Sequence, residues 1–221
     1  MERILVSWSG GKDSAMALQQ VIESRHYEVI ALLTTVTEDY DRISMHGVRR
    51  SLLRLQAQSL GLKLEEVTIT KEATNSQYEA RMGEALARYR ELGVDSVVFG
   101  DIFLEDLKRY REEKLAEVGM QAVFPIWKTE TKDLARRFIA NGFKAVTTCV
   151  DTQVLGKDYV GREIDEKFLA ELPAGIDPCG ENGEFHSFVY DGPILGRPVP
   201  IKRGEKVLRD GRFYYCDLLE A

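Results

Sequence analysis

The feature that most constrains the fold is a regular alternation of strand-like and helix-like segments along most of the chain. Short apolar and β-branched runs are typical of buried strands, and apolar residues at helical spacing follow them. The predicted strands cover residues 4–6, 27–36, 62–70, 96–99, 122–126 and 143–150. Most of the predicted helices end at a glycine, namely Gly61, Gly93, Gly119 and Gly142. This alternation predicts an α/β fold built on a doubly wound parallel sheet.

The pattern changes at Asp151. A helix-like acidic segment at residues 165–172 is followed by several glycines, an aromatic strand at 184–190 and a hairpin on an Asp210-Gly211 turn. We therefore expect one domain over residues 1–150 and a smaller α+β lobe over residues 151–221.

The turn after the first strand, Ser9-Gly10-Gly11-Lys12-Asp13-Ser14, combines glycines, hydroxyls and a lysine just before a helix. The free N–H groups and the dipole of a helix N-terminus attract anions, and glycines allow a phosphate to approach the backbone closely. The order of residues is not the P-loop pattern Gly-x-x-x-x-Gly-Lys-Ser/Thr. It predicts a different phosphate-binding loop, so the first domain is expected to bind a nucleotide; the alternative is a tight strand–helix turn.

Ligands of doubly wound sheets lie at the carboxyl ends of the strands, so polar residues there are candidates. Thr34 lies at the end of the second strand and the Met45-His46 pair follows it; threonine can bind a nucleotide there and methionine can cover a base. His46 is equally consistent with a surface residue. Gly100-Asp101 follows the fourth strand, where a carboxylate beside phosphates is expected to hold Mg²⁺ or the nucleotide.

The helix after Asp101 carries Arg109 and Arg111, of which one or both are candidates for neutralising phosphates. A solvated charged face is the alternative for either arginine.

The densest polar cluster covers residues 177–188. Glycines such as Gly183 flank Glu181 and Glu184, and His186 follows two residues after Glu184. This arrangement predicts a loop that presents carboxylates to a cationic group or uses them as a base toward an amine. Cys179 lies in the same loop, but no Cys-x-x-Cys pair accompanies it, which favours a quiet thiol over a nucleophile.

Composition narrows the class of protein. With 44% apolar and 30% charged residues, the chain is typical of a globular protein, and it shows no membrane-spanning run or signal-peptide pattern. Three scattered cysteines suit a reducing cytoplasm. The net charge of −6 disfavours a nucleic-acid partner. The sequence carries no signal for an oligomeric state.

These segments together resemble the diphthine–ammonia ligase family of the N-type ATP pyrophosphatases, over nearly the whole chain. Residues 9–14 resemble its pyrophosphate loop, 45–46 its Met-aromatic-His segment, and 100–113 its Gly-x-Ile…Gln-Arg-x-Arg-x-Glu stretch. Residues 125–127 resemble its Pro-Leu-Trp, and 180–187 its Gly-Glu-Gly-Gly-Glu-Phe/Tyr-Glu-Thr hallmark.

The match departs from the family pattern at several positions. The aromatic residue is missing between Met45 and His46, and Lys108 stands where glutamine is usual. Asn182 replaces a glycine and His186 a glutamate in the hallmark. The spelling of residues 177–186 resembles bacterial members, which are not expected to make diphthamide. The departures at Asn182 and His186 fall in the second lobe, where substrate recognition is expected.

The resemblance implies an ATP-dependent ligase. ATP adenylates a carboxylate, which in that family belongs to diphthine on an elongation factor, pyrophosphate leaves, and ammonia attacks the acyl-adenylate to form an amide. The expected nucleotide-binding residues are Ser7, Ser9, Gly10, Gly11, Lys12, Asp13, Ser14, Thr34, Met45, His46, Gly100 and Asp101. The expected catalytic residues are Lys12, Asp13, Ser14 and Asp101, with Asp13 and Asp101 holding Mg²⁺. The expected substrate-binding residues are Arg109, Arg111, Glu181, Gly183, Glu184 and His186.

Two other functions remain open at this point. A tRNA-modifying member of the same superfamily would use a paired or reactive cysteine and a basic RNA-binding surface. A non-catalytic sensor would bind ATP or AMP without turnover.

Overall fold

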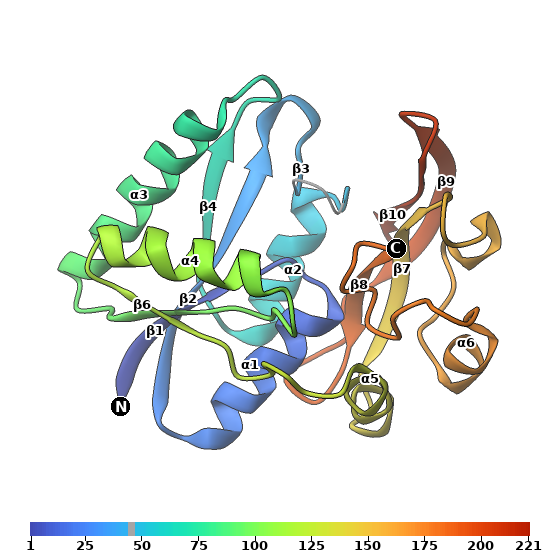
Figure 1. Ribbon diagram of the computed structural model, residues 1–221, viewed down its shortest axis with the longest axis horizontal. Helices are drawn as coiled ribbons and strands as arrows, with labels where there is room; N and C mark the ends of the chain where they lie inside the picture. Colours follow the sequence, from blue (N-terminus) through green and yellow to red (C-terminus); the bar gives the residue numbers. More distant parts are fainter. Residues whose placement is uncertain (44–46) are drawn as a thin grey trace.

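The structure is a computed structural model that describes residues 1–43 and 47–221, and it contains two β-sheets surrounded by helices (Figure 1). The first sheet is formed by β1 (Glu2–Ser7), β2 (Tyr27–Thr37), β3 (Arg42–Ile43), β4 (Leu64–Ile69), β5 (Ser96–Val98) and β6 (Gln121–Val123). The second is formed by β7 (Lys144–Asp151), β8 (Phe185–Asp191), β9 (Ile201–Arg209) and β10 (Phe213–Glu220). The helices are α1 (Lys12–Ser24), α2 (Arg50–Leu60), α3 (Asn75–Glu91), α4 (Glu105–Glu117), α5 (Thr131–Ala140) and α6 (Glu166–Glu171), with 3₁₀ turns at Glu38–Tyr40 and Lys157–Tyr159.

The first sheet confirms the predicted doubly wound arrangement. Its parallel strands lie in the order β4-β2-β1-β5-β6, and β3 pairs antiparallel with the last residues of β2. The chain runs outward from β1 to β2 and β4, then returns to the other side of β1 for β5 and β6. The order of the strands therefore reverses between β1 and β5, and a ligand site is expected at the carboxyl ends of these two strands.

The strand predicted at residues 143–150 exists, but its assignment to the parallel sheet is wrong. β7 lies in the second sheet, antiparallel to β8 and β10, in the order β8-β7-β10-β9. The change of sheet therefore precedes β7, and the boundary expected at residues 150/151 falls inside the second sheet. The sequence misled here because β7 is buried along nearly its whole length, as a central parallel strand would be.

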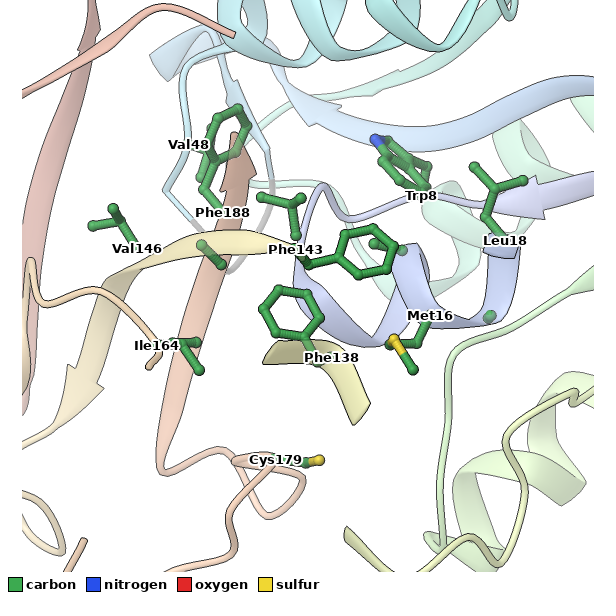
Figure 2. Packing of buried hydrophobic residues seen from close by; sticks show 14 of the residues in the cluster. Trp8, Met16, Leu18, Val48, Phe138, Phe143, Val146, Ile164, Cys179 and Phe188 are labelled. Carbon is green, nitrogen blue, oxygen red and sulfur yellow. The ribbon is translucent and has the colours of Figure 1, made fainter. Parts of the chain in front are cut away.

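The first sheet has a separate apolar core on each face. Ile4 and Val6 face α1 and α2, whereas Leu5 between them faces α3 and α4. The core on the α1 and α2 side continues without a break into the second sheet. Figure 2 shows this continuity, with Trp8 and Met16 beside Phe138, Phe143 and Phe188. The second sheet therefore lies on the side of the first sheet that α1 covers. α1 is the helix that follows the glycine loop.

The hairpin predicted at Asp210-Gly211 is confirmed as the β9–β10 turn. Both residues have positive φ angles, 52° and 64°, and the Arg212 N–H donates to the Arg209 carbonyl oxygen at 3.0 Å. The twist of such a turn matches that of the flanking strands.

Gly100 is required by close packing between β5 and α1. A Cβ atom placed on it would lie 2.8 Å from the backbone carbon of Asp13 and the nitrogen of Ser14. No side chain can be inserted there unless the helix moves.

We expect Gly100→Ala to lower the free energy of unfolding by about 1–3 kcal/mol, because it overpacks two backbones. Gly83→Ala is the control: it lies in α3 with open space around its Cβ position. That substitution should be neutral or stabilising by up to about 1 kcal/mol, since alanine favours helix. Urea unfolding of both variants measures the difference; equal stability of the two would contradict the packing argument.

Candidate functional site

The glycine loop joins β1 to α1 at the point where the strand order reverses. Gly10 has a φ of 78°, and a Cβ there would lie 2.7 Å from Gln56 Oε1, so only glycine fits. Gly11 is the N-cap of α1 and makes no side-chain cap bond. The loop therefore brings the backbone N–H groups of a helix start to the carboxyl end of β1.

Two serine hydroxyls lie together at the mouth of this loop. Ser9 Oγ and Ser14 Oγ are 3.2 Å apart, and the Gly11 N–H donates to Ser9 Oγ over a long 3.3 Å. The Ser14 hydroxyl also donates to the Gly11 carbonyl oxygen at 2.9 Å. Hydroxyls and a weakly engaged backbone N–H thus face one spot, which suits an anion that accepts several hydrogen bonds.

The second sheet holds the loop from behind. The Val189 N–H in β8 donates to the Gly10 carbonyl oxygen at 2.8 Å, and the Lys12 N–H donates to Ser187 Oγ at 3.2 Å. Sequence reasoning missed these contacts, because nothing local in β8 indicates that it runs beside residue 10. The site therefore lies between the two sheets rather than on the first sheet alone.

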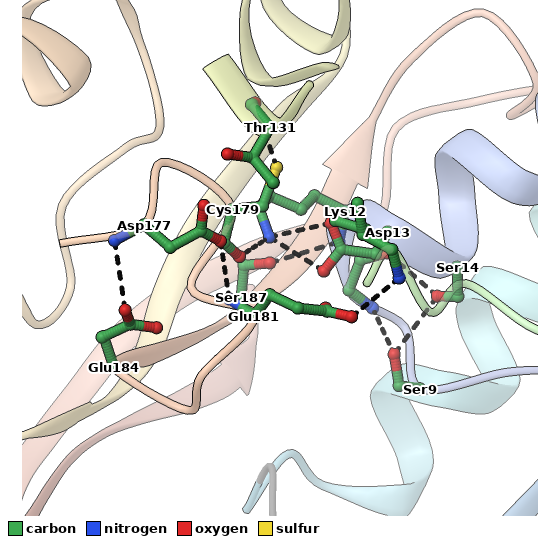
Figure 3. Close-up of polar contacts among 12 residues, drawn as sticks. Ser9, Lys12, Asp13, Ser14, Thr131, Asp177, Cys179, Glu181, Glu184 and Ser187 are labelled. Carbon is green, nitrogen blue, oxygen red and sulfur yellow. Dashed lines mark hydrogen bonds and ion pairs between the residues drawn. The ribbon is translucent and has the colours of Figure 1, made fainter. Parts of the chain in front are cut away.

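Lys12 is a buried cation surrounded by acceptors. Its ammonium lies 2.8 Å from Asp13 Oδ2, donates to the Cys179 carbonyl oxygen, and sits 5.4 Å from the centre of the Phe185 ring (Figure 3). Burial lowers the pKa of Lys12, but Asp13 and its other neighbours more than offset this, so the net pKa is raised. Burial also raises the pKa of Asp13, against the effect of Lys12. Lys12 therefore carries its charge at the start of α1.

Asp101 is buried beside the loop and is paired with Arg111. The Arg111 Nε lies 2.7 Å from Asp101 Oδ2, and the guanidinium stacks 4.3 Å from the centre of the Phe99 ring. Arg109 is placed differently: its side chain is 68% exposed and pairs with Asp106 on its own helix. Of the two arginines predicted for the site, the structure brings only Arg111 to Asp101.

The loop before β8 reaches across to the chain segment beside the glycine loop. Glu181 Oε1 accepts a hydrogen bond at 2.7 Å from the N–H of Ile102, the residue directly after Asp101. In Figure 3, Glu181 lies beside Lys12 and Asp13, on the side of the loop that faces α1. Glu181 therefore joins the site.

Glu184 is buried inside its own loop, which differs from the predicted contact with substrate. Its carboxylate accepts from the Asp177 N–H at 3.1 Å and from the Asn182 N–H at 3.0 Å. The Asn182 side chain adds a third bond, and Gly183 makes the turn with a φ of 86°. These bonds give Glu184 a structural role in the loop, because they occupy both carboxylate oxygens.

The protonation of the loop side chains follows from their burial. Burial raises the pKa of Glu181 to about 7, and it lowers the pKa of His186 to about 4 together with the nearby charge of Lys12. Burial also raises the pKa of the Cys179 thiol, which donates to the Thr131 carbonyl oxygen at 3.3 Å. Cys179 is thus a protonated thiol near neutral pH, in agreement with the quiet role that the sequence favoured.

A cavity of about 460 Å³ opens beside the loop. Ser7, Ser9 and Thr34 line it at the strand ends, and residues of α3 and α4 such as Tyr78 and Tyr110 line its far side. The two other residues predicted here, Met45 and His46, lie outside the described residues.

Gln56 is a site residue that the sequence prediction did not single out. It is fully buried in α2 and its amide contacts Trp8, Gly10 and Val189. The sequence carried one signal for Gln56: it is an amide on the helix face whose other residues, Val48, Leu52 and Leu55, are apolar.

The fold and the loop together define the class: a doubly wound α/β protein with a glycine loop and a buried lysine at its topological switch point. The chain belongs to the diphthamide synthase family, because the profile of the diphthamide synthase N-terminal domain matches residues 2–122 and that of the C-terminal domain matches residues 130–218. The first match ends within β6 and the second begins just before α5, so β7 and β8 of the second sheet fall in the second match.

Several curated relatives match over 93% of this chain. Diphthine–ammonia ligase of Homo sapiens is 26% identical over 93% of this chain and 85% of its own. That of Danio rerio is 26% identical over 93% and 89%, and that of Schizosaccharomyces pombe is 24% identical over 93% and 37%. Among solved structures, the U34-tRNA thiolase NcsA of Methanococcus maripaludis is similar with a TM-score of 0.39 and 16% identity, over 62% of this chain and 57% of that one. Within residues 1–43 and 47–221, no helix has the length and apolar character needed to cross a membrane.

We expect Glu181→Gln to change how stability depends on pH. The pKa of Glu181 in the folded protein, about 7, lies above its ordinary value of 4.5. The folded state therefore binds this proton more tightly, and the stability it contributes is full below pH 4.5 and lost as the pH rises through about 7.

Urea unfolding of the wild type and the variant at about pH 5 and about pH 8 measures this effect. The free energy of unfolding of Glu181→Gln, relative to wild type, should rise between the two pH values. Glu84→Gln, an exposed carboxyl in α3, is the control and should show no such change. A flat difference for Glu181→Gln would contradict the assignment.

Proposed function

We propose that this protein is an ATP-dependent ligase that forms an amide through an acyl-adenylate, with release of AMP and pyrophosphate. The observation that supports this most directly is the convergence of Lys12, Asp101 and Glu181 on the helix start that follows the glycine loop. The names of the curated relatives, diphthine–ammonia ligases, support a carboxylate and ammonia as the groups that are joined.

In the first step, a carboxylate oxygen of the acceptor attacks the α-phosphorus of ATP, and the bond from this phosphorus to the bridging oxygen of pyrophosphate breaks. Negative charge then develops on pyrophosphate. In this proposal that charge is stabilised by the loop N–H groups, by the hydroxyls of Ser9 and Ser14, which lie 3.2 Å apart, and by the buried ammonium of Lys12. Donors held in position before reaction are often the largest single contribution to catalysis.

In the second step, ammonia attacks the acyl carbon, AMP leaves with the oxygen it shared with that carbon, and the nitrogen loses a proton. Glu181 is the residue proposed to accept this proton or to hold the ammonium ion beforehand. A carboxyl whose pKa is about 7 exchanges protons near neutral pH, which suits a general base. His186 suits this role less, since its pKa of about 4 leaves it a weak base.

Asp13 and Asp101 fit the magnesium ion that accompanies ATP in such chemistry. Among the described residues, no group of three or more His, Cys, Asp or Glu side chains is arranged to hold a metal. Mg²⁺ bound with a nucleotide needs only one or two protein carboxylates, because phosphates and water supply the other oxygens. The packing of Gly100 against Asp13 places the two aspartates on adjacent backbones. The ion would neutralise phosphate charge there.

The cysteines argue against the thiolation alternative. All three are buried, and burial raises the pKa of each thiol. A reactive thiol needs the opposite shift.

Product analysis with α-labelled ATP, Mg²⁺ and ammonium tests the proposal, with and without an acceptor pool fractionated from cell extract. AMP and pyrophosphate formed only with the pool are expected. ADP and phosphate would refute the cleavage site, and bound but uncut ATP under every condition would favour the sensor.

We expect Ser14→Ala and Asp101→Asn to lower the rate of AMP formation by about 10²-fold, because the first removes a hydroxyl donor toward pyrophosphate and the second a carboxylate proposed to hold Mg²⁺. Arg109→Ala is the matched control: this exposed arginine pairs only with Asp106 among the contacts described, and its loss should leave the rate unchanged. Equal rates for all three variants would refute the assigned site.

A further inference from the structure

The peptide unit between Gly10 and Gly11 can in principle take two orientations. In a trans peptide the C=O and the N–H point in opposite directions, so one of them faces the phosphate side of the loop. Residues without a Cβ adopt both φ signs at little cost, so a Gly-Gly peptide is easily turned over. With the N–H inward the loop offers a donor to an anion, and with the C=O inward it offers a repulsive oxygen.

The structure shows the N–H inward. The Gly10 carbonyl points away from the mouth of the loop and accepts two bonds, from the Val189 N–H at 2.8 Å and from Gln56 Nε2 at 3.0 Å. The Gly11 N–H points toward Ser9 Oγ, on the side where the serine hydroxyls meet.

The side-chain amide of Gln56 can hold only one orientation. The indole N–H of Trp8 is solely a donor, and it donates to Gln56 Oε1 at 3.0 Å. The NH₂ group must then face the other way, where it donates to the carbonyl oxygens of Gly10 and Val189. Gln56 has no exposed surface, so water does not replace these bonds.

We propose that Gln56, oriented by Trp8, is a positioning residue that holds the Gly10–Gly11 peptide with its N–H toward the leaving pyrophosphate. Gln56 itself touches no substrate in this scheme. It acts by keeping a carbonyl oxygen out of the anion site, and it ties the loop to β8 of the second sheet at the same time. The inference rests on the proposed function, because the role of Gln56 requires that the glycine loop binds pyrophosphate.

The test compares two ligands on Gln56→Met, which keeps the side-chain volume but removes the donors. Calorimetry with Mg²⁺ measures the affinity for inorganic pyrophosphate, which depends on the loop donors, and for adenosine, which carries no phosphate. We expect the variant to bind pyrophosphate at least about tenfold more weakly, the scale of one lost hydrogen bond to a charged group, and adenosine as the wild type does.

Tyr89→Phe is the matched control for lost stability. Tyr89 is also buried and its hydroxyl donates to Glu65 at 2.9 Å and accepts from Lys63 at 2.9 Å, but it lies in α3, in the core on the opposite face of the first sheet. This variant should lose stability and keep its affinity for pyrophosphate. If Gln56→Met does not fold, Trp8→Phe tests the same bond from the other end and should weaken pyrophosphate binding in the same sense.

The outcomes separate the inference from the proposed function. A wild-type protein that binds no pyrophosphate refutes both. A wild type that binds it, with Gln56→Met binding equally well, refutes only the positioning role. Equal weakening of pyrophosphate binding by Gln56→Met and Tyr89→Phe, or equal loss of both ligands in Gln56→Met, reduces Gln56 to a stabilising residue.

Discussion

The architecture depends on the contact between the glycine loop and β8. The Gly10 carbonyl accepts from the Val189 N–H, and the Lys12 N–H donates to Ser187 Oγ, so a loop of the first sheet is bonded to a strand of the second. The apolar cluster that includes Met16 of α1 and Phe188 of β8 surrounds this contact. Because the two sheets share a core at this point, neither can move relative to the other without disturbing the loop.

Placing the site at this junction has an electrostatic consequence. Lys12 is buried between the sheets, where an isolated charge would be strongly disfavoured, and Asp13 together with the Cys179 carbonyl compensates it. Asp101 and Glu181 bring further acidic groups to the same place. Arg111 neutralises Asp101, and burial raises the pKa of Glu181 to about 7, so fewer negative charges would oppose a phosphate at the proposed site. The acidic loop is thus compatible with the proposed anion site, although a cluster of acidic residues alone would repel a phosphate.

The sequence predictions were accurate where a feature depends on residues close together in the chain, and they failed where it depends on residues far apart. The strand–turn–helix unit around residues 9–14 was predictable because glycine conformation and helix ends are local properties. The parallel sheet was predictable because its strands and helices alternate. The assignment of β7 to that sheet was wrong, since a buried strand has the same apolar pattern in either sheet. The roles of Glu181 and Glu184 were indistinguishable in sequence, because both are acids in one loop and only their partners differ.

The sequence by itself therefore determined the main helices and strands, the alternation that builds the five-stranded parallel part of the first sheet, and the chemical groups available at the ends of those strands. Each of these depends on residues close together in the chain, through backbone conformation, helix capping and apolar periodicity. Only the tertiary structure decided which sheet β7 joins, which acid faces the loop, and that Gln56 and Val189 orient the Gly10 carbonyl. These depend on partners more than a hundred residues apart or on buried hydrogen bonds, whose geometry exists only once the two sheets have packed together.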